Sequence, residues 1–133
     1  MIIKAETIPV RGDADVVSIR QIIRQWTMEL GFGLVDQTKM VTAASELARN
    51  MVLYGGGGEV RLEALNSDVR RGLKVTFEDH GPGIPDIQLA LKDGYTTGNG
   101  LGLGLGGAKR LVNDFDVHSR PGEGTRVTIT RWK

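Results

Sequence analysis

A run of glycines alternating with leucines is the stretch of this sequence with the clearest chemical potential. It reads Gly98-Asn99-Gly100-Leu101-Gly102-Leu103-Gly104-Leu105-Gly106-Gly107, and the helix-favouring residues Ala108-Lys109-Arg110-Leu111-Val112 follow at once. Where a glycine run opens a helix, free backbone N–H groups and the positive end of the helix dipole bind anions, phosphate above all. A flexible linker is the alternative, but linkers combine glycine with serine, whereas alternate leucines favour burial. We therefore interpret the run as a phosphate-binding loop.

Glu46 and Asn50 form a second candidate pair on a helix expected over about residues 36–54. Because they are four residues apart, their side chains stack on one side of the helix. They fall at the edge of its apolar stripe, which comprises Met40, Ala43, Ala44, Leu47, Met51 and Tyr54. A carboxylate there can act as a general base, and a carboxamide oxygen can ligate a hard cation such as Mg²⁺. An ordinary helix flank accounts for the same pattern, so the pair is a weak motif by itself.

Asp79 is a third candidate, because it ends the apolar face of a strand expected over residues 71–79. Leu73, Val75 and Phe77 share that face, since alternate side chains of a strand point the same way. A carboxylate that ends a buried row needs a specific partner. Either backbone N–H groups of the following turn, Gly81-Pro82-Gly83, provide it, or a ligand donates the hydrogen bond. The glycines of this turn allow a close approach of the backbone, and His80 is expected to be a bystander.

The helices that must position these residues follow from the spacing of apolar side chains. Steps of three and four predict a first helix that runs to Gly31 and buries Val16, Ile19, Ile23, Trp26 and Leu30. The second helix, over about residues 36–54, has Asp36 as its expected cap. The tetraglycine at residues 55–58 ends it. A short helix is expected over residues 86–93, and another follows the glycine run to about Asn113.

Five alternating stretches predict strands, at residues 2–10, 59–66, 71–79, 115–119 and 125–132. Short turns join the second stretch to the third and the fourth to the fifth, as in antiparallel hairpins. Three main helices and about five strands predict an α/β (α+β) two-layer sandwich, a mixed, largely antiparallel sheet covered by helices on a single face. Since no repeat or internal linker interrupts the pattern, we expect residues 1–133 to form one domain.

The composition excludes several classes of function. Seventeen basic and sixteen acidic residues leave a formal net charge of +1, so a broad electrostatic footprint for nucleic acid or an anionic membrane is missing. The absence of cysteine excludes disulfides and thiolate chemistry and fits a reducing cytoplasm. No apolar run approaches the length of a membrane span, and the first residues do not read as a signal peptide. We expect a soluble cytoplasmic protein with neither nucleic acid nor membrane as a partner.

The order of these motifs resembles that of the GHKL (Bergerat-fold) ATP-binding superfamily. Glu46-x-x-x-Asn50 lies on a helix, Asp79-x-Gly81-x-Gly83-Ile84 follows a strand, the glycine run precedes a helix, and Gly124-Thr125 opens the last strand. Each part is weak, but the joint match is specific. Histidine kinases, type II topoisomerases, the Hsp90 chaperone and mismatch-repair ATPases share this fold. Because none of them is this short and no phosphoacceptor-histidine helix pair precedes the motifs, we expect one of the small anti-sigma and switch kinases of bacterial partner-switching systems.

Within that group the sequence is most similar to the RsbT-type switch kinases of the stressosome. The matching phrases are Glu29-Leu30-Gly31-Phe32-Gly33, Ser45-Glu46-Leu47-Ala48-Arg49-Asn50, Glu78-Asp79-His80-Gly81-Pro82-Gly83-Ile84-Pro85-Asp86-Ile87 and Gly106-Gly107-Ala108-Lys109-Arg110-Leu111. They cover most of the chain. That family usually has proline where this sequence has Gly106, which loosens the junction between the glycine run and the next helix.

The resemblance implies ATP and Mg²⁺ as cofactors and gives individual residues their roles. Asp79 accepts a hydrogen bond from the adenine amino group, and Thr125 holds the same edge through water. Asn50 ligates Mg²⁺, and Glu46 is the catalytic residue that orients or deprotonates the acceptor hydroxyl. Residues 94–107 form a lid whose N–H groups surround the phosphates, so that positioning and charge neutralisation carry the catalysis. Gly83 lets the backbone lie close to the base, and the other implied nucleotide-binding positions are Gly81, Ile84, Gly98, Gly100, Gly102, Gly104 and Gly106.

The resemblance also implies an activity and partners. A serine/threonine protein kinase of this type transfers the ATP γ-phosphate to Ser or Thr of STAS-domain stressosome proteins, both scaffold and co-antagonist. It is then released to activate a downstream effector such as a phosphatase or another signalling enzyme. An anti-sigma factor kinase that sequesters a sigma factor is a second interpretation. A nucleotide-dependent binding module with little turnover is a third.

Overall fold

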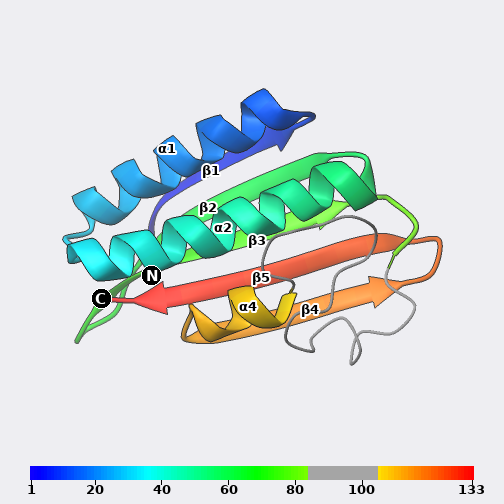
Figure 1. Cartoon of the computed structure of the whole chain (residues 1–133). Helices are drawn as coiled ribbons and strands as arrows, with labels where there is room; N and C mark the ends of the chain where they lie inside the picture. Colours follow the sequence, from blue (N-terminus) through cyan, green and yellow to red (C-terminus); the bar gives the residue numbers. More distant parts are fainter. Residues whose placement is uncertain (84–104) are drawn as a thin grey trace.

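The structure is a computed structural model that describes residues 1–83 and 105–133, which form five strands and three helices (Figure 1). In chain order these elements are β1 (Ile2–Val10), α1 (Asp13–Glu29), α2 (Leu34–Gly55), β2 (Gly58–Asn66), β3 (Arg71–Asp79), α4 (Leu105–Arg110), β4 (Asp114–Arg120) and β5 (Gly124–Trp132). The predicted strands at residues 2–10 and 71–79 are confirmed, and the other three lengthen by one residue or two. The helix predicted at residues 86–93 lies outside the described residues.

The five strands form one sheet in the order β1-β2-β3-β5-β4. All four pairings are antiparallel, including the two predicted hairpins, β2–β3 and β4–β5. The fold prediction is therefore confirmed, and no parallel pairing occurs among residues 1–83 and 105–133. The registers place Val75 of β3 opposite Leu62 of β2 and Ile129 of β5, so apolar side chains line up across the sheet.

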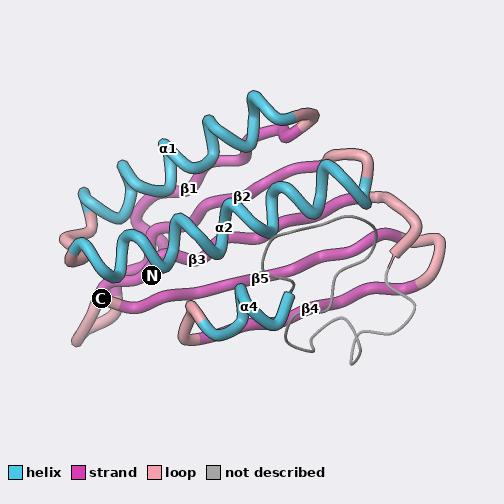
Figure 2. The backbone as a smooth tube through the Cα atoms, viewed as in Figure 1, coloured by secondary structure: helices cyan, strands magenta, loops and turns pink. Residues whose placement is uncertain are grey.

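The helices form a second layer on one face of this sheet, as predicted (Figure 2). The core lies between the layers, where the largest fully buried side chains include Ile19, Ile23, Met40, Leu62 and Leu73. Burial of such a side chain contributes about 1.5–3 kcal/mol. The opposite face of the sheet carries polar side chains from neighbouring strands, among them Thr7, Arg61, Thr76 and Thr128. Every candidate site residue on a helix therefore faces or borders a single interlayer space.

Lys4 of the edge strand β1 contacts two residues of α1. The Lys4 ammonium group lies 4.2 Å from the ring centroid of Trp26 and 3.3 Å from Oε2 of Glu29. The Gln25 amide donates a further hydrogen bond to Glu29, at 3.0 Å. Hydrogen bonds from Gln25 and Lys4 hold the pKa of the Glu29 carboxyl below its usual value. These exposed contacts fix α1 over β1, at the end of the sheet away from Asp79.

The expectation that Asp36 caps α2 is wrong. The helix begins at Leu34, with Gly33 as its N-cap and no side-chain capping bond. Asp36 instead lies in the first turn and pairs with Nη2 of Arg131 on β5, which is 95 residues away in the sequence. Arg131 also donates from Nη1 to the carbonyl of Leu111, at 2.8 Å. The carboxylate therefore joins α2 to β5 and to the residue that follows α4.

The helix after the glycine run differs in extent from its prediction. It begins at Leu105, so Gly106 and Gly107 belong to α4 and not to a preceding loop. Leu105 and Ala108 are buried in the core cluster, and this packing extends the helix back into the glycine run. The helix ends at Arg110, short of Asn113, because the amide of Asn113 already donates to Thr130 of β5 and draws the chain into the sheet. Among the described residues, no helix is both long enough and apolar enough to span a membrane.

Candidate functional site

A row of small and polar residues crosses one end of the sheet, on the face that the helices cover. Asp79 of β3 lies opposite Gly58 of β2 and Thr125 of β5, and Thr125 lies opposite Ser119 of β4. The apolar rows next to it, such as Phe77 with Val127, are buried. Polar groups thus replace the core side chains where β3 and β5 meet their turns. This end of the sheet is the one toward which α2 runs (Figure 1).

The carboxylate of Asp79 is half-buried and has one partner in the turn that follows it. Its Oδ1 accepts a hydrogen bond from the backbone N–H of Gly81, at 3.0 Å. The turn therefore satisfies one oxygen, as the structural alternative for Asp79 predicted. Within the described residues no donor reaches Oδ2, so this second oxygen can accept a hydrogen bond from a ligand. The interpretation that the turn partners Asp79 is confirmed for Oδ1, and the interpretation that a ligand donates to Asp79 stays a prediction for Oδ2.

The end of α2 lies directly against this carboxylate. A methyl group added at Gly55, the last residue of α2, would be 2.5 Å from Oδ2 of Asp79, closer than side-chain carbons approach. A methyl group at Gly81 would similarly lie 2.6 Å from the Cα of Gly55. Because both positions lack a side chain, the helix end, the strand end and the turn can meet. A side chain at position 55 would therefore displace the Asp79 carboxylate.

The turn that follows Asp79 and the β4–β5 turn are joined by a hydrogen bond. The amide of Gly122 in the β4–β5 turn donates to the carbonyl of Pro82, at 2.8 Å. Gly124 adopts φ +91, where a side chain is strained and would also meet the carbonyl of Asp79. A side chain at Gly83 would meet the carbonyl of Arg120. Glycine at position 83 thus allows the two turns to pack against each other. The close approach of the Gly83 backbone to a base stays a prediction.

Thr125 is held by a hydrogen-bonded serine that the sequence analysis did not single out. The Oγ atoms of Ser119 and Thr125 are 2.8 Å apart, and the Ser119 hydroxyl donates to the carbonyl of Gly124 at 3.0 Å. Both side chains are half-buried. Alternation within residues 114–120 could have placed Ser119 on the inner face, but its partner across the hairpin depends on the register.

Glu46 and Asn50 lie on α2 upstream of Gly55. At 1.5 Å per residue, Asn50 is about 7.5 Å and Glu46 about 13.5 Å from Gly55 along the helix axis. Both are half-buried at the margin of the apolar stripe, whereas Arg49 is exposed, as the helical spacing predicts. Neither has a hydrogen bond or ion pair within the described parts of the chain. Their side chains are thus available for a ligand, about one and a half and two and a half helical turns before Gly55.

The described residues contain no group of three or more His, Cys, Asp or Glu side chains that could hold a metal ion. An ion bound mainly by phosphate oxygens, with one protein oxygen in addition, is compatible with that composition. The amide oxygen of Asn50 fits this role. Of the other predicted nucleotide-binding residues, Ile84, Gly98, Gly100, Gly102 and Gly104 lie outside the described residues, and Gly106 is buried in α4.

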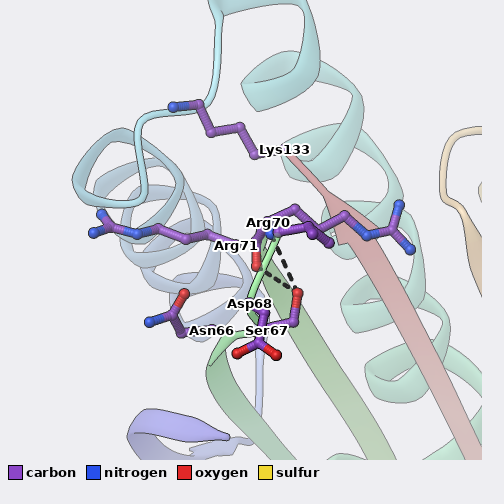
Figure 3. A pocket seen from close by; sticks show the side chains of 7 residues that line it. Asn66, Ser67, Asp68, Arg70, Arg71 and Lys133 are labelled. Atoms are coloured by element: carbon purple, nitrogen blue, oxygen red, sulfur yellow. Dashed lines mark hydrogen bonds between the residues drawn. The ribbon is translucent and has the colours of Figure 1, made fainter.

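The opposite end of the sheet has an open pocket beside the β2–β3 turn, lined by Asn66, Ser67, Asp68, Val69, Arg70, Arg71 and Lys133. Its cationic groups diverge, and the two guanidinium groups point to opposite sides (Figure 3). That of Arg70 lies 4.5 Å from the ring centroid of Trp132, and the Lys133 ammonium lies beside Gly31. Because these charges do not converge, the pocket does not form an anion-binding site.

Known proteins resemble the chain in sequence. Residues 35–133 match the family described as histidine kinase-, DNA gyrase B-, and HSP90-like ATPases. The Serine/threonine-protein kinase RsbT of Bacillus subtilis (strain 168) is 48% identical over 118 residues, which cover 89% of each chain. The Anti-sigma F factor of Thermoanaerobacter sp. (strain X514) is 26% identical over 118 residues, which cover 85% of this chain and 82% of that protein.

Two solved structures share the fold. The crystal structure of the RsbU and RsbW domains of a Mycobacterium tuberculosis protein has a TM-score of 0.62 at 19% identity, covering 98% of this chain. The present chain spans only 33% of that protein. The mycobacterial sensor histidine kinase MprB has a TM-score of 0.58 at 20% identity and is covered to 97%, as is this chain. The match over residues 35–133 and the 48% identity to the Bacillus subtilis kinase show that the chain belongs to the histidine kinase-, DNA gyrase B- and HSP90-like ATPase family and, within it, to the RsbT-like serine/threonine-protein kinases.

Proposed function

We propose that this chain transfers the γ-phosphate of Mg·ATP to a Ser or Thr of STAS-domain stressosome proteins. The observation that carries the proposal is the half-buried Asp79 carboxylate, with Oδ1 bound by Gly81 and Oδ2 available beside Gly55. A fixed acceptor at the edge of an interlayer space suits the exocyclic amino group of adenine. We further propose that residues 1–133 act as a single domain in the cytoplasm.

The adenine end of the nucleotide would be bound by residues of β3, β5 and the intervening turns. Asp79 accepts from the amino group, and Thr125, directly opposite on β5, holds the same edge through water. Gly81 and Gly83 keep the turn close to the base, together with Ile84. Since a buried hydrogen bond that is lost costs about 1–3 kcal/mol, these contacts can select adenine over guanine.

The phosphate end would lie along α2 toward Glu46. Asn50 holds the Mg²⁺ ion, whose bound charge offsets that of the phosphates. Glu46, one turn further from Gly55, takes the proton of the acceptor hydroxyl or orients it. The backbone N–H groups of the glycine run at residues 98–104 would supply the remaining phosphate ligands. Gly106, in the first turn of α4, would join the run to a packed helix.

The partners follow from the same proposal. Phosphorylation of the STAS-domain scaffold and co-antagonist proteins releases the kinase, which then activates a downstream effector such as a phosphatase or another signalling enzyme. The 48% identity to the kinase RsbT favours this over other outcomes. Sequestration of a sigma factor is the second candidate, favoured by the 26% identity to an Anti-sigma F factor.

Incubation of the purified chain with γ-labelled ATP and the STAS-domain proteins of the same genome tests the proposal. Label should reach Ser or Thr of a STAS protein in the presence of Mg²⁺, and Asp79→Asn should lower this transfer when ATP is limiting. Asp116→Asn, on the outer face of β4, is the matched control and should transfer label normally. Recovery of a sigma factor on the immobilised chain, without labelled STAS protein, would support the second candidate. Nucleotide binding with no transfer would support a binding module.

A further inference from the structure

We propose that an open stripe along α2 is the docking surface for the folded domain that carries the acceptor Ser or Thr. The open stripe comprises Val35, Lys39, Thr42, Glu46, Asn50 and Leu53. Its two aliphatic end residues, Val35 and Leu53, anchor the acceptor domain on either side of Glu46. The inference rests on the proposed function, since it assumes a protein acceptor whose hydroxyl meets Glu46. It adds the contacts that select the protein substrate.

The open stripe runs along most of the length of α2. Steps of three and four residues place its six members within about 80° around the helix axis. The three central members, Thr42, Glu46 and Asn50, are half-buried, and the two aliphatic members at its ends are exposed. The stripe therefore lies at the margin between the buried face of α2 and its exposed face. A protein that approaches Glu46 from solvent has to cover this margin.

Large apolar side chains are exposed at both ends of α2 and not along its middle. Val35 is 67% exposed and Leu53 is 58% exposed, and each has an exposed apolar neighbour in the chain, Leu34 or Tyr54. Apolar side chains that are exposed singly need no explanation. Two pairs that lie on either side of the proposed general base, with the stripe members between them, form a surface that a partner can bury.

The spacing of the two anchors suits a folded domain. At 1.5 Å per residue, Val35 is about 16.5 Å before Glu46 along the helix axis and Leu53 about 10.5 Å after it, so about 27 Å separates the anchors. A protein–protein contact of standard size covers about 800 Å² of each partner, which is about 30 Å across. A domain whose contact is centred near Glu46 would thus cover both anchors.

Two other occupants fit the open stripe less well. An extended peptide of about eight residues would span it, but ordering that backbone costs more free energy than two exposed aliphatic side chains contribute. A membrane surface binds a continuous apolar helix face with basic residues beside it. Here polar residues separate the two anchors, and Lys39 and Glu46 carry opposite charges. A folded domain requires neither a continuous apolar face nor the ordering of a chain.

Steady-state transfer from γ-labelled ATP to the STAS protein that accepts the label tests the inference. Val35→Ser and Leu53→Gln should each raise KM for that protein about three- to tenfold, because each removes an aliphatic contact that docking buries. The kcat at saturating acceptor and the calorimetric affinity for Mg·ATP should stay unchanged, since the lost contact does not involve the reacting atoms. The double variant should raise KM by about the product of the two effects, because the anchors are far apart.

Val17→Ser and Met28→Gln on α1 are the matched controls. Their side chains are similarly exposed, at 51% and 55%, but lie on the other long helix. Neither change should alter KM for the STAS protein. A synthetic peptide of eight residues around the labelled Ser or Thr should have a much higher KM than the whole protein, and equal KM values would assign the stripe to a peptide.

The outcomes separate this inference from the proposed function. If no STAS protein takes up label from the unaltered chain, the proposed function fails. If label is transferred but either stripe variant keeps the unaltered KM, or the α1 controls raise KM as much, the inference is overturned and the function stands. A loss of Mg·ATP affinity or of kcat at unchanged KM would place the anchor in the nucleotide site and would also overturn it. Should a variant not fold, Val35→Thr or Leu53→Lys replaces it under the same criteria.

Discussion

Gly55 and Asp79 meet where α2 ends, so closely that a methyl group on Gly55 would lie 2.5 Å from Oδ2 of the Asp79 carboxylate. This contact joins a helix end to a strand end across the interlayer space. The carboxylate lies against the helix end on one side, and the Gly81 amide holds it from another, at 3.0 Å from Oδ1. A helix that ended in any larger residue would displace the acceptor on which the proposed adenine contact depends.

Gly55→Ala should therefore weaken ATP binding roughly ten- to a hundredfold, because the displaced carboxylate loses a buried hydrogen bond worth about 1–3 kcal/mol. Alanine favours a helix over glycine, which offsets part of the cost of displacing the Asp79 side chain. Calorimetric titration with ATP measures the effect. Gly33→Ala is the matched control at the other end of α2, where nothing lies within 4 Å of an added methyl group. Equal ATP affinities in the two variants would contradict the positioning role of Gly55.

Asp79→Asn tests the acceptor itself. The carboxamide oxygen can still accept from Gly81, so the turn should keep its structure. The NH₂ group would replace Oδ2 and oppose the amino group of adenine, donor against donor. ATP affinity should fall roughly ten- to a hundredfold, and GTP should not suffer the same loss. Calorimetry with both nucleotides gives the answer, and unchanged ATP affinity would show that Asp79 does not contact adenine.

The sequence predicted the layers because each depends on local periodicity. Alternation identified the five strands, and the three-to-four spacing in α1 identified the buried side chains Val16, Ile19, Ile23 and Trp26. The same spacing placed Glu46 and Asn50 at a helix margin, and the end of the alternation placed Asp79 at a strand end. The position of a residue could thus be predicted from the sequence where it depends only on the periodicity of its own helix or strand.

Contacts between elements that are distant in the sequence could not be predicted from local patterns. Asp36 was expected to cap its helix, but its partner Arg131 is 95 residues away, and no local pattern predicts that pair. The tetraglycine indicated only a helix end, although Gly55 meets the Asp79 carboxylate. The role of Ser119 depends on the β4–β5 register, and a shift by one residue would have turned it outward. Each of these needs the tertiary arrangement.

Glu46 and Asn50 should separate chemistry from binding. Glu46→Ala should leave Mg·ATP affinity nearly intact and lower phosphotransfer by roughly two to four orders of magnitude, the usual range for a lost general base. Asn50→Ala should weaken nucleotide binding only when Mg²⁺ is present, because it removes a proposed ligand of the ion. Filter binding with and without Mg²⁺, beside single-turnover transfer, distinguishes them. Arg49→Ala, on the exposed side of α2, should change neither quantity. Identical behaviour of the first two variants would refute the division of roles.

The Asp36–Arg131 pair should contribute to the stability of the fold and not to specificity. Asp36→Asn removes one charge from a pair whose arginine is largely buried, with 14% of its side chain exposed. The free energy of unfolding should fall by about 1–3 kcal/mol, since hydrogen bonds to charged groups are the stronger ones. Urea unfolding measures this loss. Asp13→Asn, in the first turn of α1, makes the same change near a helix dipole and should cost about 0.3–1 kcal/mol. Equal losses would mean that the dipole, and not Arg131, accounts for the effect.

Gly106→Pro tests how the glycine run is joined to the fold. Gly106 is the second residue of α4 and its φ is not positive, so proline fits a first turn where a missing N–H is tolerated. By restricting the unfolded chain, proline should raise the free energy of unfolding by about 0.4–1 kcal/mol and tighten ATP binding slightly. If residues 95–104 close over the phosphates, their amides should exchange fast without nucleotide and be protected by Mg·ATP, more strongly in the proline variant. Thermal unfolding, calorimetry and hydrogen exchange follow the three quantities separately. Equal protection with and without nucleotide would show that the run is not a phosphate-binding lid, whereas a gain in stability without tighter ATP binding would confine the effect of proline to α4.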